Sequence, residues 1–280
     1  MTNSRAACTI ALAVIFSAVS AHAGGNTRYL ALGDSVAFGF SPLIPYTKLT
    51  VSGGDFIGYP ESTADAAGLN ETNASCPGET SGSFLDASQP DNGCHSGPKY
   101  SRYLKVDYNG APNQMAFALN YLANHRDTKV ITINLGGNDL LLLEQQCHQS
   151  PDFEQCEENQ LPGLLANDAT HLAHIFGNLR GAGFNGQIIV LTQYATNYAD
   201  PLEAGAVSRL RDVTAGVAGS SNFRVDVAPG FEAFKLASAS TNGDACQAGL
   251  LIKLPNGTCD VHPNDAGRDV LTNAVLSVLK

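Results

Sequence analysis

Short apolar runs alternate along the chain with longer segments in which apolar residues recur at helical spacing. Four runs of this kind predict strands at residues 28–32, 129–135, 187–192 and 223–227, and those at 129–135 and 187–192 have the composition of buried strands. Helical spacing predicts helices at residues 112–125, 160–179, 201–217 and 265–279, the last with Asn264 as its N-cap. Strands that alternate with helices of this length are typical of a parallel sheet covered on both faces.

The other segments show weaker patterns. Residues 39–98 are rich in Gly, Pro, Ser and Asn and predict long loops with one short helix, whereas residues 103–108 suggest a further strand. No linker, repeat or charge block marks a second domain. We therefore expect residues 24–280 to form a single α/β domain, a three-layer α/β/α sandwich with a central parallel sheet of flavodoxin-like type.

The beginning of the chain has a different character. Arg5 precedes an apolar run over residues 6–19, which meets the small-residue pattern Ala21-His22-Ala23. This arrangement predicts a signal peptide over residues 1–23 and a secreted protein, extracellular or periplasmic. The apolar run is shorter than the roughly 20 residues that span a bilayer, so we expect no stable membrane anchor.

Composition and charge narrow the classes of partner. Apolar residues make up 44% of the chain, which suffices for a buried core. The formal net charge is −10 and the chain contains no cluster of Lys and Arg, so we expect no binding of nucleic acid, whose phosphates require such clusters.

The cysteines predict disulfides. Of the seven, Cys8 would leave with the signal peptide, and an even number in an exported chain indicates a disulfide framework. Spacing alone does not fix the connectivity. We predict the pairs that are close in sequence, each closing a loop between expected elements: Cys76–Cys94, Cys147–Cys156 and Cys246–Cys259. Because neither CxxC nor HExxH occurs, we expect no metal and no other cofactor.

Three polar motifs fall at junctions between predicted elements. Gly33-Asp34-Ser35 follows the first strand, Gly136-Gly137-Asn138-Asp139 follows the strand that ends at Leu135, and His262-Pro263-Asn264 precedes the last helix. Each is common alone, but in open parallel sheets active sites gather beyond the carboxyl ends of the strands. Their joint occurrence in this order therefore points to one site.

These motifs resemble the blocks of the GDSL/SGNH hydrolases. Gly33-Asp34-Ser35 is similar to the first block, Gly78 within Cys76-Pro77-Gly78-Glu79-Thr80 to the second, Gly136–Asp139 to the third and His262-Pro263 to the last. The resemblance implies the SGNH-hydrolase fold and a carboxylic ester hydrolase, an esterase or lipase. It also implies Ser35 as nucleophile, His262 as general base, and an oxyanion hole formed by the backbone N–H groups of Ser35 and Gly78 and the side chain of Asn138.

The acid that would orient the histidine departs from the family pattern. The family places an Asp three residues before the histidine, where this chain has Cys259, and the nearest acid is Asp260. In an extended segment residues two apart project to the same side, so Asp260 would reach His262. The alternative is a backbone carbonyl that holds the ring. We assign Asp34 and Asp139 to structure, as acceptors for backbone amides.

Several functions share such a site. The leading hypothesis is hydrolysis of a small-molecule or lipid ester through an acyl-enzyme on Ser35, by a monomer. An acyltransferase, a polysaccharide acetylesterase and a catalytically inert binding protein of the same fold are the alternatives. Residues 36–45 are apolar, and would either line an acyl pocket or pack in the core.

Overall fold

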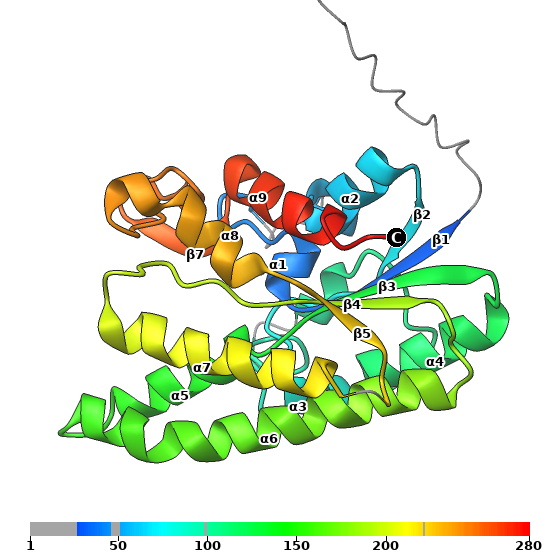
Figure 1. Ribbon diagram of the computed structural model, residues 1–280, viewed down its shortest axis with the longest axis horizontal. Helices are drawn as coiled ribbons and strands as arrows, with labels where there is room; N and C mark the ends of the chain where they lie inside the picture. Colours follow the sequence, from blue (N-terminus) through cyan, green and yellow to red (C-terminus); the bar gives the residue numbers. More distant parts are fainter. Residues whose placement is uncertain (1–26, 46–50, 98–99, 221) are drawn as a thin grey trace, which may run out of the picture.

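The computed structural model describes residues 27–45, 51–97, 100–220 and 222–280, and a parallel sheet runs through its centre (Figure 1). The predicted signal peptide lies outside the described residues. The sheet has five strands in the order β2-β1-β3-β4-β5, and all neighbours are parallel. The strands are β1 (Arg28–Gly33), β2 (Asn70–Asn73), β3 (Thr128–Asn134), β4 (Gln187–Leu191) and β5 (Val225–Ala228).

Helices cover both faces of this sheet (Figure 1). One layer contains α3 (Ser81–Leu85), α4 (Gln114–Asn124), α5 (Gly137–Cys147), α6 (Phe153–Gly181) and α7 (Pro201–Ala218). The other contains α1 (Ser35–Phe38), α2 (Tyr59–Ala67), α8 (Gly230–Ala237) and α9 (Asp265–Leu276). In β1, Leu30 and Leu32 pack with the first layer and Tyr29 and Ala31 with the second, because successive side chains point to opposite faces. The predicted α/β/α sandwich is confirmed.

The segment predicted as loops is more ordered than its composition suggested. Residues 51–97 contain α2, β2, α3 and a 3₁₀ turn at Gly53–Asp55. The edge strand β2 has the sequence NETN, whose polar residues gave no strand signal, and it pairs with β1 alone. The prediction of a strand at residues 103–108 was wrong. A 3₁₀ turn at Tyr100–Tyr103 leads there into irregular backbone, from which Val106 and Tyr108 pack against the core.

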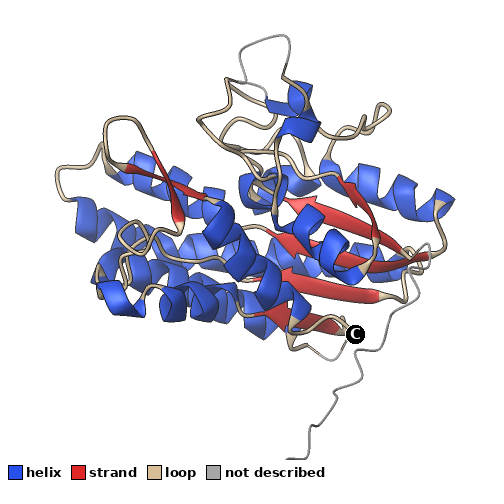
Figure 2. Ribbon diagram, turned by 90° about the horizontal axis from the view of Figure 1, so that it is seen from above, coloured by secondary structure: helices blue, strands red, loops and turns tan. Residues whose placement is uncertain are grey.

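A small hairpin stands apart from the main sheet (Figure 2). Its strands are β6 (Leu251–Lys253) and β7 (Cys259–Pro263), which pair antiparallel. Sequence patterns predicted neither strand, and they also missed α8, which follows β5 directly. The hairpin matters for function because β7 carries His262.

The three predicted disulfides are confirmed: Cys76–Cys94, Cys147–Cys156 and Cys246–Cys259. Each bridges segments that come after the carboxyl end of a strand. Disulfides persist in oxidising surroundings, so they suggest an extracellular or periplasmic protein. Among the helices of the described residues, none combines the length and the hydropathy needed to cross a bilayer.

Candidate active site

Ser35 lies at the first position of α1, directly after β1. The preceding Asp34 is the N-cap, and its Oδ1 accepts a hydrogen bond of 2.9 Å from the Val36 N–H. Gly33 has φ +136°, and a Cβ there would come within 2.3 Å of the carbonyl oxygen of Asn134. Only glycine permits this contact between the ends of β1 and β3, which presents Ser35 at the carboxyl edge of the sheet.

Asp34 is buried behind Ser35. Burial raises the pKa of Asp34 to about 7, although the Val36 N–H and the side chain of Gln193 hydrogen-bond its carboxylate. Gln193 donates from Nε2 to Asp34 Oδ2 at 3.0 Å. Gln193 comes two residues after β4, so it also belongs to the carboxyl edge of the sheet. Sequence analysis missed it, although its place just beyond a predicted strand was a usable signal.

The third motif connects to the second through side-chain hydrogen bonds. Asn138, near the start of α5, donates from Nδ2 to the carbonyl oxygen of Glu79 at 3.0 Å and accepts on Oδ1 from Asn92 at 3.2 Å. Gly78 has φ +85°, and its carbonyl accepts from the Asn92 N–H at 2.8 Å. A Cβ at Gly78 would lie 2.4 Å from the carbonyl oxygen of Asn92. The structure thus brings Gly78 and Asn138 into one neighbourhood.

Asp139 stabilises the same junction. Its two carboxylate oxygens accept hydrogen bonds from the backbone N–H and the hydroxyl of Ser81, at 2.9 and 2.8 Å. Ser81 begins α3, so this contact joins the starts of α3 and α5. The carboxylate therefore connects two helices, and Asp139 does not line the cavity that contains Ser35.

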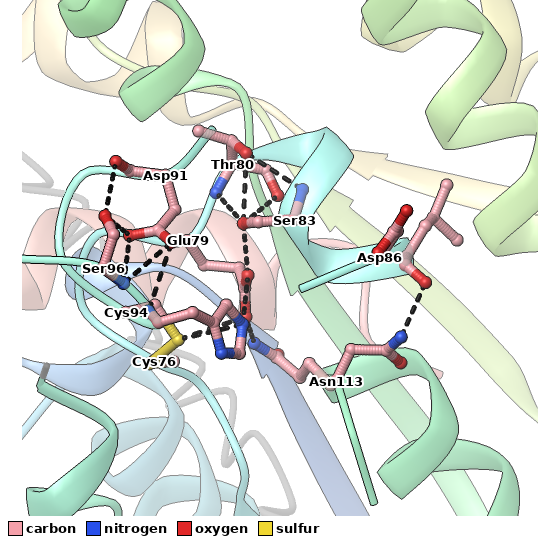
Figure 3. Close-up of polar contacts among 12 residues, drawn as sticks. Cys76, Glu79, Thr80, Ser83, Asp86, Asp91, Cys94, Ser96 and Asn113 are labelled. Carbon is pink, nitrogen blue, oxygen red and sulfur yellow. Dashed lines mark hydrogen bonds and ion pairs between the residues drawn. A yellow bond between two sulfur atoms is a disulfide. The ribbon is translucent and has the colours of Figure 1, made fainter. Parts of the chain in front are cut away.

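Glu79 is a fully buried carboxylate beside the first disulfide (Figure 3). It accepts hydrogen bonds from the Ser83 hydroxyl and, at 3.0 Å, from Gln114 Nε2. His95 Nε2 lies 3.3 Å from Glu79 Oε1, and this hydrogen bond raises the pKa of His95. The sulfur atoms of Cys76 and Cys94 are also close, but they are joined to each other and so provide no thiolate for a metal.

His262 is paired with Asp260. Its Nδ1 hydrogen-bonds Asp260 Oδ1, which also accepts from the His262 backbone N–H at 3.0 Å. Both residues lie on β7, where positions two apart face the same side. Burial raises the pKa of Asp260, but the hydrogen bonds and the charge of His262 outweigh it and hold that pKa below its usual value. The structure thus places Asp260, and no backbone carbonyl, against Nδ1.

The segment around His262 is held from several directions. The Tyr194 hydroxyl donates to the carbonyl oxygen of Val261 at 2.7 Å, and the Cys246–Cys259 disulfide fixes the start of β7. Asn264 caps α9 and donates from Nδ2 to the carbonyl of Leu251 at 2.9 Å. The rings of Phe40 and His262 are in contact, with centroids 5.0 Å apart. The imidazole is therefore fixed in position before any substrate binds.

Ser35, Asn138 and His262 line the same cavity, whose volume is about 320 Å³. Asp260 lies behind His262, and Gly78 lies outside the wall, one residue before the Glu79 carbonyl that Asn138 contacts. Beyond these polar groups the wall is mainly apolar. Of residues 36–45 only Val36 reaches the cavity, while Phe38 and Phe40 pack with Phe56 in a cluster of their own.

A serine, an Asp-paired histidine and an asparagine amide thus surround one cavity at the carboxyl edge of a parallel sheet. The family follows from the sequence match: the model of the GDSL-like lipase/acylhydrolase family matches residues 31–270. The chain belongs to this family.

Solved structures share the fold at low sequence identity. Phospholipase A1 from Streptomyces albidoflavus NA297 superposes with a TM-score of 0.58 at 16% identity, over 91% of this chain and all of that one. A lipase from a goat rumen metagenome gives 0.54 at 14% identity, over 90% and 97% of the two chains. An acetylxylan esterase from Geobacillus stearothermophilus gives 0.51 at 16% identity, over 91% and 94%. Among curated proteins, none matches the sequence.

Proposed function

We propose that the mature protein, residues 24–280, is an exported serine hydrolase that cleaves carboxylic esters through an acyl-enzyme on Ser35. The observation that carries this proposal is that His262, paired with Asp260 behind it, lies in the same cavity wall as Ser35. Because Asp260 engages Nδ1, the imidazole keeps Nε2 free to accept a proton. Export is supported by the apolar run at residues 6–19 and by the three disulfides.

The reaction takes two half-reactions. His262 Nε2 takes the proton of Ser35 as its Oγ bonds to the ester carbonyl carbon, and the carbonyl oxygen becomes an oxyanion. The backbone N–H groups of Ser35 and Gly78 and the Nδ2 of Asn138 would stabilise that charge. The alkoxy group then leaves with the proton from His262, and the acyl group stays on Ser35. A water molecule, deprotonated by His262, adds to the acyl carbon, and the acid departs as Ser35 regains its proton.

The acyl group of the proposed substrate is longer than acetyl. The phospholipase, the lipase and the acetylxylan esterase that share the fold act on different esters, so likeness to them selects none. The apolar wall beyond Ser35 is what supports a lipid or small-molecule ester with an acyl group longer than acetyl.

The test is hydrolysis of p-nitrophenyl acetate, butyrate, octanoate and palmitate by the purified mature protein and by Ser35→Ala. We expect turnover with the wild type, none above background with the variant, and labelling of the wild type alone by an organophosphonate. Equal release of nitrophenol by both proteins on every ester would refute the proposal and favour an inert binding protein.

A further inference from the structure

We propose that the apolar part of the cavity, between α5, α6 and α7, binds the acyl chain of the ester, and that the Cys147–Cys156 disulfide limits the length of chain it accepts. This inference rests on the proposed ester hydrolysis. It adds the location of the acyl group and the residues that select among acyl chains. We refer to this part of the cavity as the acyl chamber; its wall includes Leu140, Leu143, Phe153, Leu161 and Val207.

The direction of α5 indicates which part of the substrate enters the chamber. The helix carries Asn138 beside Ser35, and its next turns supply Leu140 and Leu143 to the wall. His262 faces the cavity from the β7 hairpin, which belongs to the opposite side of the sheet (Figure 1). Because His262 must protonate the leaving alcohol, the alcohol departs on the hairpin side. The acyl group, bonded to Ser35, is then directed along α5.

The length of the chamber suits an acyl chain of medium length. At about 1.5 Å per residue, Leu143 lies about 7 Å along α5 from Asn138, and Cys147 about 13 Å. An extended covalent chain advances roughly 1.2 Å per bond, so the chamber admits roughly six to eleven bonds. The volume agrees: about 150 Å³ holds a benzene-sized apolar ligand, and the whole cavity has about twice that volume.

The far end of the chamber is a cross-linked cluster. Leu143, Leu161 and Cys147 are buried together, with Phe153 and Cys156 packed against them. The disulfide joins the last residue of α5 to the first turn of α6, which keeps the two helices together behind Leu143 and Leu161. A chain longer than the chamber would have to separate these helices.

Charge in the wall restricts the acyl group further. Four carboxylate residues border the chamber: Glu144, Glu157, Asp200 and Glu203. Burial raises the pKa of Glu157, and Glu144 adds to the rise. A second carboxylate on the acyl chain would be repelled by these like charges. The expected substrates are therefore esters of uncharged acids of medium chain length.

The test measures kcat/KM on p-nitrophenyl acetate, butyrate, octanoate and palmitate, with the number of active sites counted by organophosphonate labelling. The wild type should prefer octanoate. Leu161→Trp fills the chamber and should lower the octanoate-to-acetate ratio at least tenfold, because a substrate's acyl chain must compete with the indole. Leu143→Ala lengthens the chamber, and the double variant Cys147→Ser/Cys156→Ser releases its end; both should raise the palmitate-to-octanoate ratio severalfold.

Leu236→Trp is the matched control, because Leu236 is 79% exposed on α8 and outside the cavity wall. It should keep the wild-type ratios. Wild-type ratios in all the chamber variants would overturn the inference while leaving ester hydrolysis intact. If Ser35→Ala and the wild type do not differ on any ester, the proposed function itself fails. Each kcat/KM value is calculated per labelled active site, so a variant that is partly unfolded does not appear to have changed its chain-length preference.

Discussion

The side-chain amide of Gln114 binds both polar backbone groups of Gly33. Its Oε1 accepts from the Gly33 N–H at 2.6 Å, and its Nε2 donates to the Gly33 carbonyl at 3.0 Å. The edge strand β2 has already ended at Asn73, and although the Cys76 N–H still donates to the Gly33 carbonyl, Gln114 supplies the acceptor for the Gly33 N–H. A residue on α4 thereby fixes the turn that presents Ser35.

Replacement of this amide should weaken the fold and the reaction together. Gln114→Leu leaves the buried Gly33 N–H without a partner, which costs about 1–3 kcal/mol, and also removes a hydrogen bond to Glu79. We expect the free energy of unfolding in urea to fall by about 2–4 kcal/mol and kcat to fall with it. The control is Gln155→Leu on the exposed start of α6, which should change neither. Equal urea midpoints for wild type and Gln114→Leu would contradict the assigned role.

Asp260 should control the turnover number. Asp260→Asn removes the negative charge that stabilises the imidazolium and allows the amide to donate, which favours the wrong histidine tautomer. We expect kcat on p-nitrophenyl esters to fall at least tenfold. Asp265→Asn changes a nearby carboxylate that is exposed and pairs with Arg268, so it should leave kcat unchanged. Turnover by Asp260→Asn at the wild-type rate would remove Asp260 from the catalytic machinery.

Asn138 should act on the transition state more than on substrate binding. Loss of one oxyanion donor typically lowers kcat by about 10²–10³, and we expect this for Asn138→Ala with little change in KM. Asn92→Ala removes only the hydrogen bond to Asn138 Oδ1 and leaves Nδ2 in place, so its effect should be smaller. A loss for Asn92→Ala as large as that for Asn138→Ala would indicate that both act by holding the backbone of residues 78–79.

Asp168 should make stability depend on pH. It is buried in α6, and burial raises its pKa to about 7, with a further rise from Asp139 that the Ser81 hydroxyl only partly opposes. The folded state therefore holds this proton more tightly than the unfolded chain, whose carboxyl has the usual pKa of 3.8. Between these two pH values the unfolded state binds fewer protons, so the group's contribution to stability falls as pH rises.

Asp168→Asn removes this titration. At pH 8 we expect the variant's free energy of unfolding to exceed that of the wild type by about 1–3 kcal/mol, because the variant has no buried charge. Its melting temperature should be higher as well. At pH 5 the folded carboxyl is protonated whereas that of the unfolded chain is largely ionised, so the difference should be clearly smaller than at pH 8, and it should vanish only as the pH approaches 3.8. Asp212→Asn alters an exposed carboxylate on α7 and should show no such pH dependence. A constant difference across this pH range would disprove the ionisation of Asp168.

The strands that were predicted most accurately from the sequence are the buried ones. Strands β1, β3 and β4 are covered on both faces, so they read as uninterrupted apolar runs. The strand β2 has polar residues at an edge, and β7 mixes Cys, Asp, Val, His and Pro on a two-stranded hairpin. Neither has a periodic pattern, and tertiary contacts determine both.

Sequence analysis could identify site residues that come directly after predicted strands. It could not identify residues that reach the site through contacts between distant segments. Ser35 and Asn138 come directly after predicted strands, and the rule for the carboxyl ends of strands identified them. Gln114 binds Gly33 from a segment 81 residues away, and it binds Glu79 from 35 residues away. No local pattern reports contacts of this kind.

The three disulfides join cysteines only 18, 9 and 13 residues apart. The entropy lost on closing a loop grows with its length, so for every cysteine the native partner is also the one that costs least to reach. Correct pairing is thus favoured in the unfolded chain, before the sheet assembles. Oxidative folding of this protein should proceed without extensive disulfide reshuffling.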